Sequence, residues 1–425
     1  MEALKTAAKL ALNRLMELGG EQAAVTASRG ETTELSALSG ELTQLRSCTE
    51  ESLVMTVMKG ARRGSIRVST LERARILAAA EECMTLLRHA EPDADWSLAE
   101  TAETGDFLTG CVQPDREAMF RRSEELLRSV KTRFPHILVE QLIAEHTKGT
   151  EYYLNSVGSE FTHLDGAYCF SLEYSAHDGE RCTSFFGSEV MTDRLDTPIM
   201  ELGTLAYDLS ACERSLNAES IGGSFSGTLL LHPNCLADFL SSAMQLYCED
   251  DSVIEKTSLW KNRLGKQVAD RRLTLSVAPL DSRIMGGERY TPEGFHAEDY
   301  VWIQNGILKS FCLSLYGERA SGFPRAKNGD CCLVAEPGDT PFRELLASIE
   351  RGILVGRFSG GEPAPNGDFS GVAKNSFLIE HGEIKCALNE TMISGNLAEL
   401  LLNITGISEE IYCDGSNALP WSVVN

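Results

Sequence analysis

The sequence predicts an α+β protein: an N-terminal α/β region with antiparallel sheet and helices, followed by a C-terminal β-rich domain of antiparallel sheet around a helix. Two observations predict this class. Segments with helical 3.6-residue spacing of apolar residues are interspersed with long β-branched, alternating segments. Their order gives no regular strand–helix–strand repeat. The 425 residues, 43% of them hydrophobic, are enough for two or three domains.

The N-terminal α+β region is expected over residues 1–90. It begins with an amphipathic helix that stops at Gly19 and Gly20, continues as a small antiparallel meander over 21–70, and returns to helical spacing over 71–89. Residues 91–106 then contain six acids and no base. This charge pattern predicts an acidic linker or exposed loop over 91–113.

A middle region of antiparallel sheet plus helix is expected over residues 114–222, packed with the N-terminal region. Turn-rich sequences such as His177-Asp178-Gly179 separate its predicted strands. Asp196, followed by Pro198, predicts the start of a helix over 200–216. The predicted helix at 115–132 comes before the predicted strands, which are 137–145, 152–156, 168–174 and 182–190.

The C-terminal domain is expected over residues 223–425, with a strand at 227–231, a helix at 236–248 and a last helix at 397–404. Two similar segments place Asn305-Gly306 and His381-Gly382 at tight turns between apolar strands, which predicts two hairpins. Residues 356–371, rich in glycine and proline, are too long for a simple connection and predict a functional loop or lid.

Composition excludes some classes of function. The net charge of −23 gives a surface that repels phosphate backbones and anionic lipid, so no direct nucleic-acid or membrane partner is expected. No apolar run approaches the roughly 20 residues of a membrane span. The 13 cysteines, without a C-x-x-C pair, suit free thiols in a reducing compartment, and we expect a cytoplasmic protein.

Motifs for catalysis are missing from the sequence. It contains no H-E-x-x-H, no phosphate-binding glycine loop and no G-x-S-x-G, and its eight histidines are well separated. None of the cysteines has a basic partner nearby in the sequence, which favours buried free thiols over a reactive one.

Six segments in the C-terminal half carry a resemblance to a known family, the TldD/TldE (PmbA) family, and within it to the TldE branch. Looser agreement at 60–71 and 155–158 extends this resemblance over essentially the whole chain. In order, the six segments are Leu264-Gly265-Lys266-Gln267, Pro279-Leu280-Asp281-Ser282, Asn305-Gly306-Ile307-Leu308, Gly367-Asp368-Phe369-Ser370-Gly371, His381-Gly382-Glu383-Ile384 and Ile393-Ser394-Gly395-Asn396-Leu397.

The resemblance implies a subunit of a cytoplasmic zinc metallopeptidase that acts on unfolded proteins or peptides. The family has also been called a modulator of DNA gyrase. Its zinc motif, H-E-x-x-x-H, corresponds here to His232 with Pro233 in place of the glutamate and Ala237 in place of the second histidine. Proline cannot act as a base, and alanine cannot bind a metal. We therefore expect His232, with Cys413 as a second vestigial position, to hold no metal.

Under this resemblance the chain has no catalytic residues and no cofactor of its own, and zinc is expected in a TldD-like partner subunit. The chain alone is expected to form a homodimer. Peptide binding is predicted at the two hairpins and the 356–371 loop; the equally weighted alternative makes these ordinary core strands and an interface loop. The candidate peptide-binding residues are Arg357, Asn366, Asp368, Phe369, Asn305 and His381.

Three other functions stay open on the sequence. The first is a stand-alone homodimeric protein that binds peptides without protease activity. The second is an enzyme that uses a thiol or serine, and the third is an acidic DNA mimic. The last two rank lower because no motif supports the enzyme and because acids and bases are interspersed outside 91–106.

Overall fold

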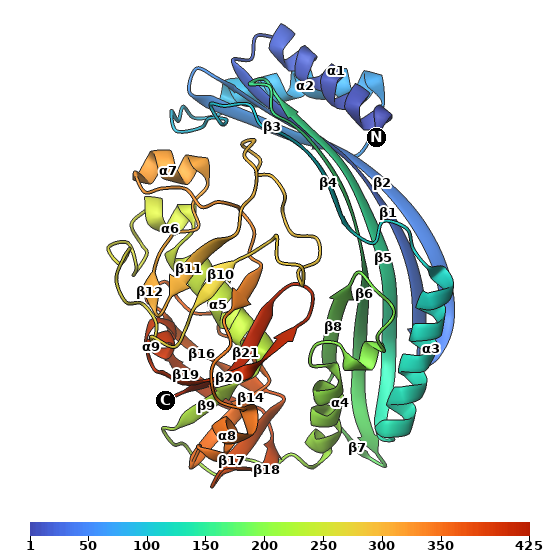
Figure 1. Ribbon diagram of the computed structural model, residues 1–425, viewed down its shortest axis with the longest axis vertical. Helices are drawn as coiled ribbons and strands as arrows, with labels where there is room; N and C mark the ends of the chain where they lie inside the picture. The colour runs from blue at the N-terminus through green and yellow to red at the C-terminus, as the bar shows by residue number, and fades with distance from the viewer.

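The structure, a computed structural model, describes residues 1–425 and confirms the α+β class. A long curved sheet from the N-terminal half forms a half-barrel, and the C-terminal domain lies on its concave side (Figure 1). Helices α1, α2 and α3 cover the convex side (Figure 1). The concave side therefore faces the C-terminal domain across an interdomain cleft.

The half-barrel contains eight strands in the order β3-β2-β1-β5-β6-β4, with β7 and β8 also paired to β6. All pairings are antiparallel except that of β4 with β6. Its elements are α1 (Glu2–Glu17), β1 (Gln22–Leu38), β2 (Glu41–Lys59), β3 (Arg62–Val68), α2 (Arg73–His89), β4 (Thr104–Gly110), α3 (Arg116–Arg133), β5 (Ile137–Asn155), β6 (Glu160–Asp178), β7 (Arg181–Cys182), β8 (Phe186–Thr192) and α4 (Leu205–Arg214).

Strand alternation gives the half-barrel an apolar convex face. Val25 and Leu53 pack under α1 and α2, whereas Leu142 and Phe170 pack in the cluster that includes α3. Because successive side chains point to opposite faces, the residues between them face the cleft. The helices therefore bury one face and leave the other for the C-terminal domain.

Several N-terminal predictions are confirmed. The meander over 21–70 is β1–β2–β3, the second helix is α2, and α3 begins where the Asp115 side chain accepts the Ala118 N–H at 2.8 Å. The prediction of separate strands at 137–145 and 152–156 is wrong, because the whole segment forms β5. The helix predicted from residue 200 begins later, at Leu205, after a 3₁₀ turn.

The acidic segment 91–113 is more ordered than a linker. Residues 104–110 form strand β4, whose backbone pairs with β6 although the strand has few apolar side chains. The preceding residues pack on the C-terminal domain: Trp96 stacks on Tyr316 at 4.0 Å between ring centroids, and Tyr316 donates to Asp93 at 2.8 Å. This segment therefore joins the two bodies.

The C-terminal domain is a ten-stranded sheet in the order β12-β11-β10-β13-β21-β9-β14-β17-β18, with β20 paired to β21. The sheet is mixed rather than purely antiparallel, because β9 pairs parallel to β14 and β13 parallel to β21. Its elements are β9 (Thr228–Leu231), α5 (Pro233–Tyr247), α6 (Asp250–Ile254), β10 (Leu275–Val277), β11 (Tyr300–Gln304), β12 (Ile307–Leu308), α7 (Leu315–Ser321), β13 (Leu333–Ala335), α8 (Phe342–Ala347), β14 (Arg351–Val355), β17 (Ser376–Glu380), β18 (Glu383–Leu388), α9 (Leu397–Leu402), β20 (Ile404–Cys413) and β21 (Ala418–Val424).

Helix α5 is the centre of this domain, as the sequence predicted. Leu236, Phe239 and Leu240 are at most 1% exposed and lie in a core of 36 residues. The 356–371 segment is not one long loop. It forms β15 (Arg357–Ser359), a turn, and the start of β16 (Asp368–Lys374), in a three-stranded sheet with β19 (Thr391–Asn396). No helix of the protein is long and apolar enough to cross a membrane.

Candidate functional site

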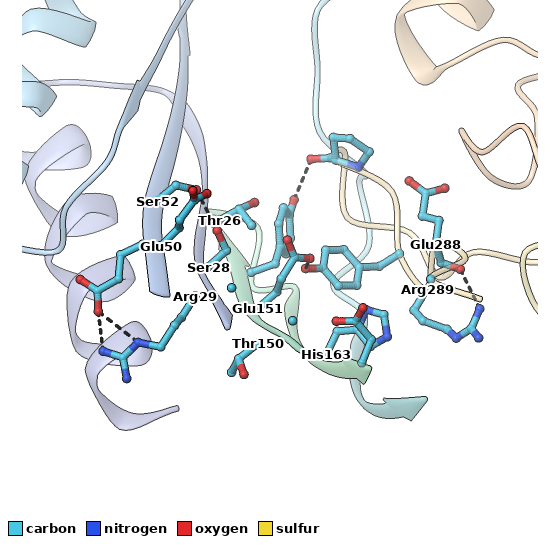
Figure 2. A pocket seen from close by; sticks show the side chains of 18 of the residues that line it. Thr26, Ser28, Arg29, Glu50, Ser52, Thr150, Glu151, His163, Glu288 and Arg289 are labelled. Atoms are coloured by element: carbon cyan, nitrogen blue, oxygen red, sulfur yellow. Dashed lines mark hydrogen bonds and ion pairs between the residues drawn. The ribbon is translucent and has the colours of Figure 1, made fainter. Parts of the chain in front are cut away.

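The cleft between the half-barrel and the C-terminal domain holds a cavity of about 930 Å³. Its half-barrel wall comes from β1, β2, β5 and β6, and its other wall is the segment 286–292 of the C-terminal domain. Figure 2 shows Ser28, Ser52 and Glu151 on the first wall, with Glu288 and Arg289 across from them. We call this cavity the interdomain cleft.

The register of the half-barrel explains why this wall is polar. Ser28 lies opposite Ser52 on one side and Glu151 on the other, and Glu151 lies opposite His163. Two residues further along, on the same face of the sheet, Gly149 lies opposite Asp165. If residue 149 had a Cβ, that atom would lie 1.9 Å from Asp165 Oδ1. The glycine therefore makes room for a carboxylate on the wall.

Burial shifts the pKa values of three ionisable side chains in the cleft. Tyr290 donates to Glu151 Oε2 at 3.1 Å, and burial raises the pKa of Glu151. Burial raises the pKa of Glu288 to about 7 and lowers the pKa of Arg289. The cleft thus presents hydrogen-bonding groups and two carboxyls whose pKa values are raised by burial, which suits a polar, extended ligand.

A smaller cavity of about 350 Å³ lies elsewhere between the two bodies, around His232. Strands β6 and β8 and helix α4 supply one side of it; the β9–α5 junction and Arg357 supply the other. His232 is 2% exposed and caps α5, with Pro233 in the first turn. We call this the His232 cavity.

Both ring nitrogens of His232 face groups of the protein. Nδ1 accepts the Asn234 N–H at 3.2 Å, and Nε2 lies 3.3 Å from Asp208 Oδ1 on α4, within ion-pair distance but without hydrogen-bond geometry. Because Nδ1 accepts, the neutral ring carries its proton on Nε2. The ring packs edge-on against Trp421, with the centroids 4.7 Å apart.

This chemistry does not fit a zinc ion. In that tautomer Nε2 offers no lone pair to a metal. No three His, Cys, Asp or Glu side chains of the chain converge in metal-binding geometry. Cys413 does not line the His232 cavity, although its neighbour Asp414 does. Its Sγ donates to the Arg283 carbonyl at 3.4 Å, and burial raises the pKa of this thiol.

The structure brings one predicted peptide-binding residue to the His232 cavity. Arg357 lines it together with Asp238, whose pKa is raised by burial and lowered by Arg357. Asn366 and Asp368 lie in the turn before β16, where Asn366 Nδ2 donates to Asp368 at 2.7 Å. Phe369 is 6% exposed and packs on Phe239 in the core.

The two predicted hairpins do not meet. Asn305 is at the β11–β12 turn and His381 is at the β17–β18 turn, and β12 and β18 are the opposite ends of the sheet order. Each hairpin does supply an edge strand. His381 is exposed and its Nδ1 lies 2.7 Å from Glu350 Oε1.

Sequence reasoning missed Asp208 and Glu288. Asp208 lies on a helix of the other body, and Glu288 lies in a segment without a regular element. Neither has a motif around it, so only the fold shows that they line cavities.

Comparisons with known proteins agree with this architecture. Residues 225–425 match the PmbA/TldA metallopeptidase C-terminal domain. A metalloprotease of Methanothermobacter thermautotrophicus is 26% identical over 85% of this chain and 76% of the relative. A metalloprotease PmbA homolog of Haemophilus influenzae is 22% identical over 92% of this chain and 88% of the relative.

The fold also matches a solved structure. The crystal structure of TldE from Thermococcus kodakarensis superposes with a TM-score of 0.82 and 18% identity, over 100% of this chain and 98% of that one. At this identity the match speaks for the fold alone. The chain carries the PmbA/TldA metallopeptidase C-terminal domain over residues 225–425, and metalloproteases align with most of its length.

Proposed function

We propose that the chain is a TldE/PmbA-like subunit of a cytoplasmic TldD/TldE-type metallopeptidase, itself without a catalytic zinc site. The observation that carries this proposal is the β9–α5 junction. There the sequence has Pro233 and Ala237 where the family's zinc motif has a glutamate and a histidine, and His232 faces Asp208 instead of a set of ligands. Zinc and the catalytic base would then come from a TldD-like partner.

In this role the interdomain cleft contributes to the binding of unfolded proteins or peptides. Ser28, Ser52 and the Tyr290–Glu151 pair offer donors and acceptors that peptide groups of any sequence can use. The Arg357–Asp238 pair in the His232 cavity offers one further charged contact.

Zinc content tests the first half of the proposal. We expect the purified chain to hold far less than one zinc per chain, and His232→Ala to leave that content unchanged. Elemental analysis measures both. One tightly held zinc per chain that is lost in His232→Ala would contradict the proposal.

Partnership tests the second half. We expect a homodimer in isolation, and a heterodimer that hydrolyses unfolded protein when a TldD-like chain is co-expressed. Light scattering and pull-down measure the assembly, and a protease assay measures the activity. A strictly monomeric chain at micromolar concentration that captures no such partner would contradict it.

The second candidate function is a stand-alone homodimeric peptide-binding protein without protease activity. It is favoured by one observation: both walls of the interdomain cleft belong to the same chain, so the cavity needs no partner to be complete. Peptide binding by the isolated chain, together with a TldD-like partner whose activity is unchanged by this chain, would favour it.

A further inference from the structure

An acidic cavity of about 350 Å³ lies against the segment that also forms a wall of the interdomain cleft. Glu288 and Pro292 line both cavities. Six of the residues around the smaller cavity are acids and only Arg325 is basic. The acids are Glu249, Asp250, Asp251, Glu288, Glu293 and Asp330.

Arg325 is engaged elsewhere. Its guanidinium stacks over Phe295, 3.6 Å from the ring centroid, and donates to the Ala326 carbonyl at 2.8 Å. Arg325 forms no ion pair with these carboxylates, so the cavity keeps an excess of negative charge. Burial and the nearby Asp330 raise the pKa of Glu288, and burial and Asp250 raise the pKa of Glu249. A cation in this cavity would offset that excess of negative charge.

A buried hydroxyl gives an independent sign that a ligand belongs here. Thr291 lines the cavity and is 5% exposed, and its Oγ1 has no hydrogen-bond partner. Buried polar atoms in folded proteins nearly always have a partner. An N–H donor entering the cavity would supply the missing one.

We propose that this cavity binds a primary ammonium group of a peptide that lies in the interdomain cleft. The group is a lysine side chain or the peptide's own N-terminal amine, and this inference rests on the proposed peptide-binding function. Glu288 and Pro292 line both cavities, so the ammonium group and the rest of the peptide would lie on either side of this segment. Met244, Leu313 and Ala326 supply apolar contacts for the methylene chain behind the charge.

The acceptors suit an ammonium better than a guanidinium or a metal ion. Glu288 Oε2 already accepts the Gly329 N–H at 2.7 Å, and the Asp330 oxygens accept the N–H groups of Glu288 and Cys331 at 2.8 Å. Neither carboxylate therefore has both oxygens free to accept two parallel hydrogen bonds from a guanidinium. An ammonium group can instead donate to single oxygens of separate residues. No three side chains here converge on a metal position.

The experiment compares three alanine-flanked tripeptides by calorimetric titration of the full chain, without any partner. The first has a central lysine and both ends blocked. The second has norleucine instead of lysine, also with both ends blocked. The third has norleucine and a free N-terminal amine. We expect one of the two amine-bearing peptides to bind at least tenfold more tightly than the blocked norleucine peptide, and which one does so identifies the source of the ammonium.

Three variants locate the site. Thr291→Val keeps the side-chain shape and removes the hydroxyl, and Glu288→Gln removes the shared carboxylate. Each is expected to weaken the tighter peptide at least fivefold. Glu124→Gln, an exposed acid on α3 outside the cavity, is expected to bind as the unaltered chain does.

Equal affinity for the three peptides would overturn the inference on the unaltered chain, whether or not the variants fold. Preserved affinity in both Thr291→Val and Glu288→Gln would also overturn it. Because no partner is present, this failure differs from a failure of the proposed function, which would appear as a lack of TldD-dependent proteolysis.

Discussion

The His232 cavity and the acidic cavity beside Glu288 have similar volumes, but their charges are compensated differently. In the first, His232 faces Asp208 at 3.3 Å and Arg357 offsets Asp238. In the second, six acids and one arginine line the cavity, and the arginine stacks on Phe295. The acidic cavity therefore favours a cationic ligand, whereas the His232 cavity has no such excess of charge.

The difference separates a cavity whose polar groups hold the two bodies together from one whose charges are left in excess. Around His232 the remaining histidine joins the two bodies of the protein, because Asp208 is on α4 of the half-barrel and Trp421 is on β21. Around Glu288 the protein keeps a local excess of negative charge. The first cavity is expected to stabilise the fold and the second to sense a ligand.

The largest expected effect tests the stabilising role of His232. His232→Ala removes a side chain that is 2% exposed, together with its packing on Trp421, so we expect a loss of about 2–4 kcal/mol in the free energy of unfolding. Urea denaturation measures it. His381→Ala is the control, because the side chain of His381 is 75% exposed, and it should cost less than about 0.5 kcal/mol.

A second variant separates packing from charge. If part of the loss comes from the contact between His232 Nε2 and Asp208 Oδ1, His232→Ala combined with Asp208→Asn should recover some stability over His232→Ala alone. A loss below about 1 kcal/mol in His232→Ala would instead show that this histidine contributes little to the fold.

The next effect concerns Glu288 and pH. Its pKa is raised from 4.5 to about 7 in the folded chain, so the protonated carboxyl favours folding. That stability is present below pH 4.5 and is lost as the pH rises through 7. Glu288→Gln mimics the protonated form, and we expect it to be more stable than the unaltered chain at pH 8.5 by roughly 2–3 kcal/mol.

The pH dependence is the signature of this effect. The gain from Glu288→Gln should shrink to under about 1 kcal/mol at pH 5, as measured by urea denaturation at both values. Glu124→Gln, on the exposed side of α3, should give no such dependence. A gain equal at the two pH values would mean that desolvation of the charged carboxylate is not its cause.

The sequence predicted the fold better than it predicted the site. Periodicity gave the meander, α2, α3 and α5, because each buries one apolar face with its own spacing. The continuous strand β5 was missed because its cleft-facing side is polar near Gly149 and Glu151, which looks like a break in a strand. Strand β4 was missed because backbone pairing with β6, rather than apolar side chains, holds it.

The cavities depend on contacts between distant segments. His232 was singled out by its position in a family motif, but its neighbour Asp208 comes from the other body and no local pattern indicates it. Phe369 was proposed to bind peptide, yet it packs on Phe239, because alternation along β16 turns it into the core. Neighbours across the cleft could not be deduced without the fold.

The smallest expected effect on stability tests whether the His232 cavity also contacts substrate. Arg357 lines this cavity, and Asn366 lies in the turn before β16, where it donates to Asp368. Both side chains are exposed, so Arg357→Ala with Asn366→Ala should change the free energy of unfolding by less than about 1 kcal/mol.

If the two residues bind peptide, the double variant should reduce hydrolysis of unfolded protein by the reconstituted TldD-like pair at least threefold, while light scattering shows intact assembly. Arg343→Ala, an exposed arginine on α8, serves as the control. Unchanged turnover in the double variant, or a loss explained by failed assembly, would leave the β15–β16 connection with a structural role. Of the His232 cavity and the acidic cavity, only the acidic cavity would then remain a candidate ligand site.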